Sequence, residues 1–307
     1  MITSFFKQAK PIHFVLIGTF LLMVFIASKM YVINEPLTFT LVLKQGFYFG
    51  IVLSSLFLLD FFASRNSLTK KNSYKLLMFG LFMAMLPETL LNSNTLLANF
   101  FILLALRRII SLRTQKDTQK KLFDAAFWIS IATLLYFWAI LFFVLIFAAM
   151  ILYSIVNVKN WIIPLTGVLA VIIIWVSWML LTNNDFTDFF DQLFVYNFDF
   201  TGLNSARIII STTILISYGT WGSFYFIKHL KDKSKNLRPS FMLIVISSII
   251  SLLIILISPY KDGSEFIFLF APLAIIMTNY LEVTKEKWFQ EVLVWVLVLI
   301  PAVFLIL

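Results

Sequence analysis

The sequence predicts an all-α membrane protein, a polytopic bundle of transmembrane helices. Hydrophobic residues make up 61% of its 307 positions, charged residues only 13%, and 35 residues are Phe. Soluble domains are about 45–50% apolar and about 25% charged, so a soluble core could not bury this much apolar surface. Backbone polar groups in a bilayer must be satisfied internally, which favours helices, and the run VLAVIIIWV at 168–176 lacks the alternation of a membrane β-strand.

Eleven apolar stretches are candidate spans, and they place residues 1–307 in a single integral membrane domain with no soluble domain. They are roughly 12–28, 40–63, 76–91, 96–112, 123–137, 138–156, 160–182, 205–227, 240–258, 266–281 and 289–307. The fifth and sixth come from one run of 32 uncharged residues, 125–156. As a single helix this run would be about 48 Å long, too long for a hydrocarbon layer of about 30 Å. We therefore expect a tight hairpin near Tyr136 and Trp138.

Charge placement supports the hairpin and orients the chain, with the N-terminus cytoplasmic and the C-terminus outside. Among 24 Lys and Arg residues, those expected outside or in the outer half of a span are Lys29, Lys44, Arg207 and Lys261. This asymmetry follows the positive-inside rule of the bacterial inner membrane. The net charge of +9 is then explained by topology and by attraction to anionic lipid headgroups, and we predict no nucleic-acid partner.

Several kinds of enzyme are excluded by composition and motif. The chain has no cysteine and only two histidines, His13 and His229, and it has no nucleophile elbow, Walker glycine loop or H-x-x-x-H pair. A histidine-ligated metal centre is therefore not expected, and no cofactor is predicted, although a divalent cation could bind elsewhere. The first apolar run lacks a small-x-small cleavage site, so we expect a retained first span.

Three aspartates recur at every third position in the long outer segment 183–204. Asp185, Asp188 and Asp191 would share one face of an amphipathic interfacial helix, with Phe side chains on the neighbouring face. Carboxylate oxygens on one face could bind a divalent cation. A solvated helix face gives the same spacing, and we favour it.

Two other outer loops and one lysine hold polar residues. Glu35 lies in the first loop, before Pro36, and Glu88 follows Pro87 in the loop PETLLNSNT, where it could form a polar lip with nearby asparagines or belong to a short turn capped by Asn94. Lys44 lies in a stretch that is either an interfacial helix or part of the second span. It could be a snorkelling anchor or a cation facing an anionic group.

The stretch SPYKDGSEFIFLFAPLA at 258–274 interrupts the hydrocarbon near the last two spans. Tyr260, Lys261, Asp262 and Glu265 precede a span that contains Pro272. Charges are ordinary in a loop, but a proline this close to the outer surface also frees backbone groups. The stretch is thus either a connecting loop or part of a site.

Two segments resemble the polytopic GT-C glycosyltransferases. Residues 94–137 are similar to an apolar helix that ends in paired basic residues before a short helix pair, and 258–276 is similar to a basic or aromatic pair before a Pro-broken helix. The whole chain also resembles a family of Bacteroidota inner-membrane proteins of unknown function. The first resemblance implies a glycosyltransferase that acts on polyprenyl-phosphate-linked sugars at the outer leaflet.

The GT-C resemblance also implies roles for individual residues. Glu35 would be the general base on the acceptor hydroxyl, and Lys261, with Lys44 as a second candidate, would hold the phosphate leaving group. Glu88 and Tyr260 would contribute to substrate binding. Members of that family usually have an acidic pair in the first outer loop, where this chain has one Glu.

Two further function classes stay open. A non-catalytic membrane subunit or scaffold of an envelope assembly would use its aromatic spans to pack against partner helices. A transporter or lipid flippase would need ionisable groups within the membrane, of which Lys44 is the clearest candidate. Membrane lipids are expected partners in every case, and other envelope membrane proteins in the scaffold case.

Overall fold

The computed structural model describes residues 1–30, 38–155, 157–182 and 195–306, and the side chains up to residue 303. Glu35, Asp185, Asp188 and Asp191 lie outside the described residues. The first half of the chain forms α1 (Ile2–Phe6), α2 (Pro11–Met30), α3 (Phe39–Arg65), α4 (Tyr74–Met85), η1 (Pro87–Leu90), α5 (Ser93–Ser111), η2 (Leu112–Thr114), α6 (Thr118–Leu135), η3 (Phe137–Phe142) and α7 (Phe143–Leu152). The second half forms α8 (Val158–Thr182), η4 (Thr201–Leu203), α10 (Ala206–Lys228), η5 (His229–Asp232), α11 (Arg238–Ile257), η6 (Ser264–Phe266), α12 (Ile267–Val283) and α13 (Lys287–Ile306).

The helical class is confirmed. Each of the eleven predicted spans corresponds to a helix or helix pair, and the described residues contain no strand. Within the described chain, six helices are long and apolar enough to cross a membrane, namely Pro11–Met30, Phe39–Arg65, Ser93–Thr114, Val158–Thr182, Arg238–Ile257 and Ser264–Val283. Tyr74–Met85 and Phe137–Leu152 are shorter apolar helices. The count of eleven crossings and the sidedness of the termini stay predictions.

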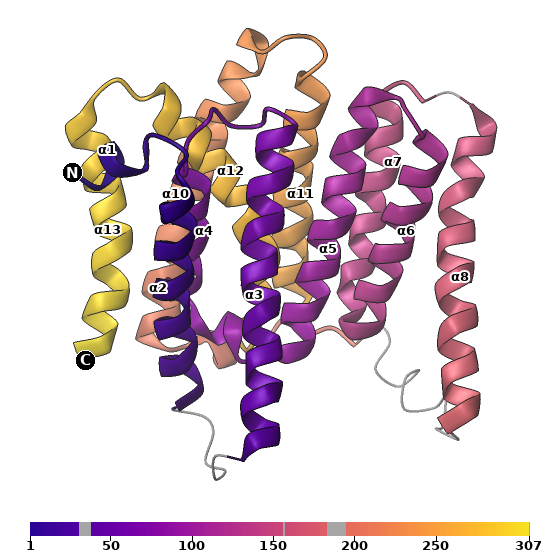
Figure 1. The fold of residues 1–307 in the computed structure, drawn as a ribbon, viewed down its shortest axis with the longest axis horizontal. Coiled ribbons are helices and arrows are strands. Elements are labelled where there is room, and N and C mark those ends of the chain that lie inside the picture. The colour runs from indigo at the N-terminus through magenta and orange to yellow at the C-terminus, as the bar shows by residue number, and fades with distance from the viewer. Residues whose placement is uncertain (31–37, 156, 183–194, 307) are drawn as a thin grey trace.

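The predicted hairpin lies where the length argument placed it. α6 ends at Leu135, Tyr136 adopts an extended conformation (φ −149°, ψ 103°), and η3 begins at Phe137. The chain then returns through α7 beside α6 (Figure 1). A single residue in extended conformation thus divides the long apolar run into two short antiparallel segments.

The second span is one long helix that includes Lys44. α3 begins at Phe39, with the Thr38 hydroxyl accepting a hydrogen bond from the Leu41 amide, and runs without a break to Arg65. The segment before the second span is therefore not a separate interfacial helix. Lys44 and Arg65 are about 32 Å apart along the axis at 1.5 Å per residue, which matches the hydrocarbon thickness of about 30 Å. Each cation can thus reach one membrane interface.

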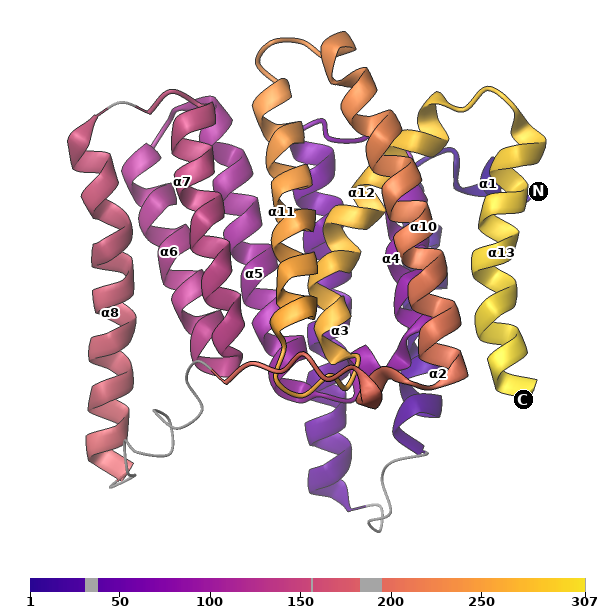
Figure 2. The same ribbon diagram turned by 180° about the vertical axis from the view of Figure 1, so that it is seen from behind.

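Two short helices form the centre of the bundle. All twelve residues of α4 are buried, and α12 is buried from Ile267 to Leu281. They pack against each other, with α2, α3 and α13 around α4 and with α10 and α11 on α12 (Figure 2). Pro272 lies inside α12 without ending it. Since α4 and α12 are enclosed by protein, the longer outer helices are the ones left to face lipid.

α8 lies at the edge of the bundle and packs on α6 (Figure 1). The contact is close because α8 has Gly167 there. A β-carbon on Gly167 would lie 2.9 Å from the Ala126 β-carbon and 2.9 Å from the Phe123 carbonyl oxygen. Small residues of this kind let membrane helices approach backbone to backbone. The other faces of α8 are exposed and apolar.

The loops gather at two ends of the bundle, which we name from the predicted topology. The inner end holds the N-terminus and loops 66–73, 115–117, 233–237 and 284–286, and the outer end holds the C-terminus and loops 86–92, 195–205 and 258–263 (Figure 1). This arrangement agrees with the predicted alternation of loops.

Candidate functional site

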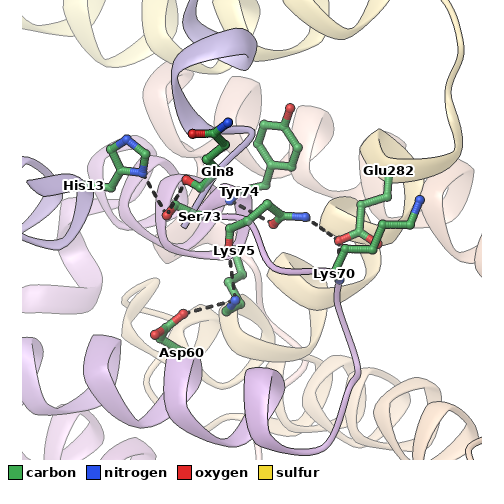
Figure 3. Close-up of polar contacts among 9 residues, drawn as sticks. Gln8, His13, Asp60, Lys70, Ser73, Tyr74, Lys75 and Glu282 are labelled. Carbon is green, nitrogen blue, oxygen red and sulfur yellow. Dashed lines mark hydrogen bonds and ion pairs between the residues drawn. The ribbon is translucent and has the colours of Figure 1, made fainter. Parts of the chain in front are cut away.

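Polar side chains cluster at both ends of the central helices. At the inner end the hub is the α3–α4 loop, where Lys75 is 1% exposed and its ammonium lies 3.0 Å from the Asp60 carboxylate and 3.1 Å from the Asn72 carbonyl oxygen. Glu282 of α12 accepts hydrogen bonds from the Lys70 amide at 2.7 Å and from the Asn72 side chain at 2.6 Å (Figure 3). These contacts connect α3, α4 and α12.

The N-terminal segment is tied to the same hub. Figure 3 shows the buried His13 ring pointing at the Ser73 hydroxyl, which lies 2.9 Å away, and the Tyr74 hydroxyl donates to the Thr3 carbonyl. Glu291 of α13 accepts hydrogen bonds from the amides of Ile2 and Thr3 and from the Thr3 hydroxyl. The inner hub therefore holds α1, α2 and α13 against α4. We infer that its polar residues have a structural role.

The outer end has a second polar cluster, where the loop before α5 meets the turn between α11 and α12. Asn92 caps α5 by accepting from the Asn94 and Thr95 amides, and its side-chain nitrogen donates to Asp262 at 3.3 Å. Asp262 also accepts from the Ser264 amide at 2.9 Å and hydroxyl at 2.6 Å. The expected cap at Asn94 is thus wrong by two residues, because the Asn92 carboxamide is the group that reaches the free amides.

Lys261 is buried at the base of this turn. It is 1% exposed, and its ammonium donates to the carbonyls of Ile255 at 2.7 Å and Leu256 at 2.6 Å, the free carbonyls at the end of α11. The Phe200 ring covers it at 4.5 Å. Burial lowers the pKa of Lys261, with Glu265 opposing the shift. Lys261 therefore caps a helix C-terminus in this arrangement, while the neighbouring Tyr260 is 72% exposed.

Glu88 packs against Gly263 and so lies beside the outer cluster. Gly263 has φ +84°, a conformation open to glycine, and a β-carbon there would lie 3.4 Å from the Glu88 β-carbon. Glu88 is 3.9 Å from Arg207 of α10. Glu88 and the 258–265 stretch, which the sequence suggested separately, are thus brought together.

Glu265 is the least expected member of this outer polar cluster. Its side chain is 0% exposed, and if it is counted as an ionised carboxylate, neither oxygen has a hydrogen-bond donor among the described residues. Its neighbour is Asp262. Burial raises the pKa of Asp262, but hydrogen bonds from Ser264, Asn92 and Glu265 more than offset this effect and lower it overall. A hydrogen bond between two carboxyl groups requires that one of them carries a proton.

An apolar groove of about 480 Å³ lies between α2 and α3 at the outer end. Its apolar lining consists of Leu22, Phe25, Ile26, Met30, Leu41, Val42, Gly46 and Phe49. Two polar side chains, Lys29 and Gln45, also line it, and the buried Gln45 side-chain oxygen has no hydrogen-bond partner among the described residues. The Lys29 ammonium donates to the Leu91 carbonyl at 3.1 Å and is near enough to the exposed Lys44 to interact electrostatically.

A second groove, of about 720 Å³, lies between α10 and α11. Asp199, Thr201, Asn204 and Thr212 are its polar lining residues, and Phe200, Ile255 and Leu256 separate it from the Lys261 ammonium. The two grooves flank the outer cluster on different sides. No group of three His, Asp or Glu side chains is arranged for a metal ion in the ranges that the structure describes.

Sequence reasoning found some of these residues and missed others. It named Glu88, Lys44, Tyr260 and Lys261, and all four lie at the outer end, although Lys261 is enclosed and Lys44 is exposed on α3. It noted Glu265 only as a loop charge and assigned no role to Lys29 or Lys75. A lysine one residue before the end of an apolar run was a signal for Lys29. The burial of Glu265 and Lys75 had no local signal.

The described residues form an all-helical bundle with six helices long and apolar enough to cross a membrane, the composition of a helical membrane protein. The chain belongs to DUF6427, a family of unknown function whose model matches residues 5–307. No curated protein and no solved structure matches it. The family description names neither a glycosyltransferase nor a bacterial group, so both stay predictions.

Proposed function

We propose that the protein binds an anionic isoprenoid-type lipid, a polyprenyl phosphate or its sugar-linked form, at the outer leaflet of the bacterial inner membrane. The observation that carries the proposal is the groove between α2 and α3, which is apolar along its length and has Lys29 among its lining residues. A molecule with a long apolar tail and an anionic head matches this distribution of surface.

The tail portion is supported by the exposed side chains around the groove. Leu22, Ile26, Val42 and Phe47 are between 38% and 59% exposed on α2 and α3. Such side chains face hydrocarbon in a membrane, so a tail can enter the groove sideways from the bilayer. The entry costs little desolvation, because lipid tails already cover this surface.

Binding of the anionic head group is supported by two lysines, one in the groove and one exposed. Among the described residues, the Lys29 ammonium donates one hydrogen bond, to Leu91, and the other two of its three N–H donors can reach a ligand. Lys44 is exposed and lies about one hydrocarbon thickness from Arg65 along α3. Two ammonium groups that repel each other are stabilised by an anion between them, and phosphate is a common partner for lysine.

A glycosyl transfer step of the GT-C kind would need a base and a cation at this place. Glu35, the proposed base, lies outside the described residues and keeps its role as a prediction. The Lys261 ammonium is already hydrogen-bonded to carbonyls of α11, so Lys29 and Lys44 are better suited to bind the leaving phosphate. Turnover with polyprenyl-phosphate-linked sugars that Glu35→Gln abolishes would support the enzyme, and turnover that survives this change would remove the role of Glu35.

Binding is tested first, with purified protein in phosphatidylcholine nanodiscs that contain a polyprenyl phosphate or the uncharged polyprenol. Native mass spectrometry should detect the phosphate bound, and Lys29→Gln together with Lys44→Gln should weaken it roughly 30-fold, at about 1 kcal/mol for each lysine. Lys287→Gln removes an exposed cation from the inner end and serves as the control. Equal binding of the phosphate and the alcohol would refute the proposal.

The flippase alternative would use the same groove, and a scaffold would offer it to a partner helix. Movement of a fluorescent polyprenyl phosphate across proteoliposomes, dependent on Lys29, would favour the flippase. Loss of lipid from the groove when a partner protein copurifies would favour the scaffold.

A further inference from the structure

The outer polar cluster contains two carboxyl groups that cannot both be ionised at low cost. Glu265 is fully buried and Asp262 lies three residues before it, in the tight turn where Lys261 and Gly263 have positive φ angles of 43° and 84°. Asp262 is exposed at the surface of the turn, whereas the Glu265 side chain is enclosed. A neighbouring like charge disfavours ionisation of a buried carboxyl group.

The hydrogen-bond donors are unequally divided between the two carboxyl groups. Asp262 accepts from the Ser264 amide, the Ser264 hydroxyl and the Asn92 side chain. Glu265 has no donor within the part of the chain that the structure describes. An ionised carboxylate without donors in a buried position costs several kcal/mol, whereas a protonated one can donate to its neighbour. The proton therefore belongs on Glu265, and Asp262 carries the charge.

We propose that Glu265 and Asp262 hold one proton between them and form a proton-binding site at the outer end of the central helices. The proton comes from water on the outer side and adds to the Glu265 carboxylate; its release leaves two adjacent anions. No other bond forms or breaks. The ligand is the proton itself, and proton binding does not require a lipid in the groove.

The charges that face this pair come from three neighbouring elements. In the turn itself, the Lys261 ammonium is held by α11 carbonyls and interacts electrostatically with Glu265. At the α6–η3 junction, the Tyr136 hydroxyl is near enough to Glu265 and Asp262 to interact electrostatically with both. Its hydroxyl donates to Ser258.

From η1 and α10, the facing groups are the carboxylate of Glu88, packed on Gly263, and the guanidinium of Arg207 beside it at 3.9 Å. The positive charge of Lys261 favours ionisation of Glu265, whereas the negative charges of Asp262 and Glu88 disfavour it. Because two carboxylates act against one buried ammonium, Glu265 should keep its proton at neutral pH.

The pair is also connected to the lipid groove by a short path. Asp262 accepts from Asn92, and the preceding residue, Leu91, accepts from Lys29. Asn92 and Leu91 therefore connect the carboxyl pair with the groove lysine. Proton dependence of lipid binding rests on the proposed function, whereas the proton site does not.

The site is tested by infrared difference spectroscopy of the intact protein in nanodiscs, titrated from acid to alkaline pH. The C=O stretch of a protonated carboxyl should persist at neutral pH in the wild type, shift in D₂O, and disappear in Glu265→Gln. The Gln side chain has the shape of a protonated Glu, so this variant should fold. Glu291→Gln is the matched control, because Glu291 is also buried but accepts three hydrogen bonds.

A second variant tests the sharing of the proton. Asp262→Asn removes the neighbouring anion, so the carboxyl band should titrate at a pH lower by about one unit. If the neutral-pH band survives Glu265→Gln, or if Glu291→Gln removes it equally, the proton site is refuted. If the band is lost in Glu265→Gln but Asp262→Asn leaves its midpoint unchanged, Glu265 holds the proton alone and the pair is refuted. Binding of polyprenyl phosphate is measured separately and can fail without affecting these results.

Discussion

The inner ion pair between Lys75 and Asp60 should respond unequally to removal of its two members. Lys75 is 1% exposed on its side chain and Asp60 is 40% exposed, at an N–O distance of 3.0 Å. Asp60→Asn leaves a buried ammonium with only the Asn72 carbonyl and a neutral amide. Lys75→Met keeps the apolar stem and leaves a carboxylate that water can reach.

The magnitudes follow from this difference in exposure. Breaking a buried pair by removing one partner costs about 3–5 kcal/mol, and the partial exposure of Asp60 reduces this to about 2–3 kcal/mol for Asp60→Asn. Lys75→Met should cost about 1 kcal/mol, the value of one hydrogen bond to Asn72. The double variant should be no less stable than Asp60→Asn, because it removes the unpaired cation.

The assay is denaturant unfolding in detergent micelles, followed by tryptophan fluorescence. Asp124→Asn provides the control, since Asp124 pairs with Arg108 at 2.9 Å but both side chains are at least 30% exposed, and its loss should cost about 0.5 kcal/mol. A larger loss of stability for Lys75→Met than for Asp60→Asn would refute the reasoning.

Three further predictions concern other parts of the bundle. Gly167→Leu should separate α8 from α6, because its side chain would meet the Phe123 and Ala126 positions; disulfide formation between cysteines placed across that interface should fall sharply, and Gly46→Leu, with open space around it, should have no effect. Acidification should destabilise the wild type as pH falls through and below the usual Asp range, because the lowered pKa of Asp262 makes its ionised form stabilising above that range; Asp262→Asn should flatten the stability–pH profile there. Glu291→Gln should weaken the hydrogen bonds that hold α1, at a cost of about 1 kcal/mol. The rate of tryptic cleavage at the exposed Lys7 should therefore rise roughly fivefold.

Much of the fold could be predicted because the membrane makes sequence signals simple. Long apolar runs indicate helices, and the excess length of 125–156 alone indicated a break, which the structure has at Tyr136. The ends were harder. The start of α5 depends on whether Asn92 or Asn94 reaches free amides, a choice that the local sequence does not make.

The candidate site was less predictable for a physical reason. Whether Lys261 faces a ligand or caps α11 depends on the backbone of the turn at Lys261 and Gly263, which brings the ammonium back to α11. The burial of Glu265 depends on η1 and α5, more than 160 residues away, as shown by the hydrogen bonds from Asn92 to Asp262 and from Ser264 to Thr95. Contacts at such separations leave no periodic pattern in the chain.

The short length of α4 has an electrical consequence. Its twelve residues extend only about 18 Å, with the inner hub at one end and the outer polar cluster at the other. The low-dielectric layer is therefore thinnest along the axis of the protein, and a membrane voltage would fall more steeply there than across the surrounding lipid. Charges at the two ends of α4 sit at the edges of that steep field.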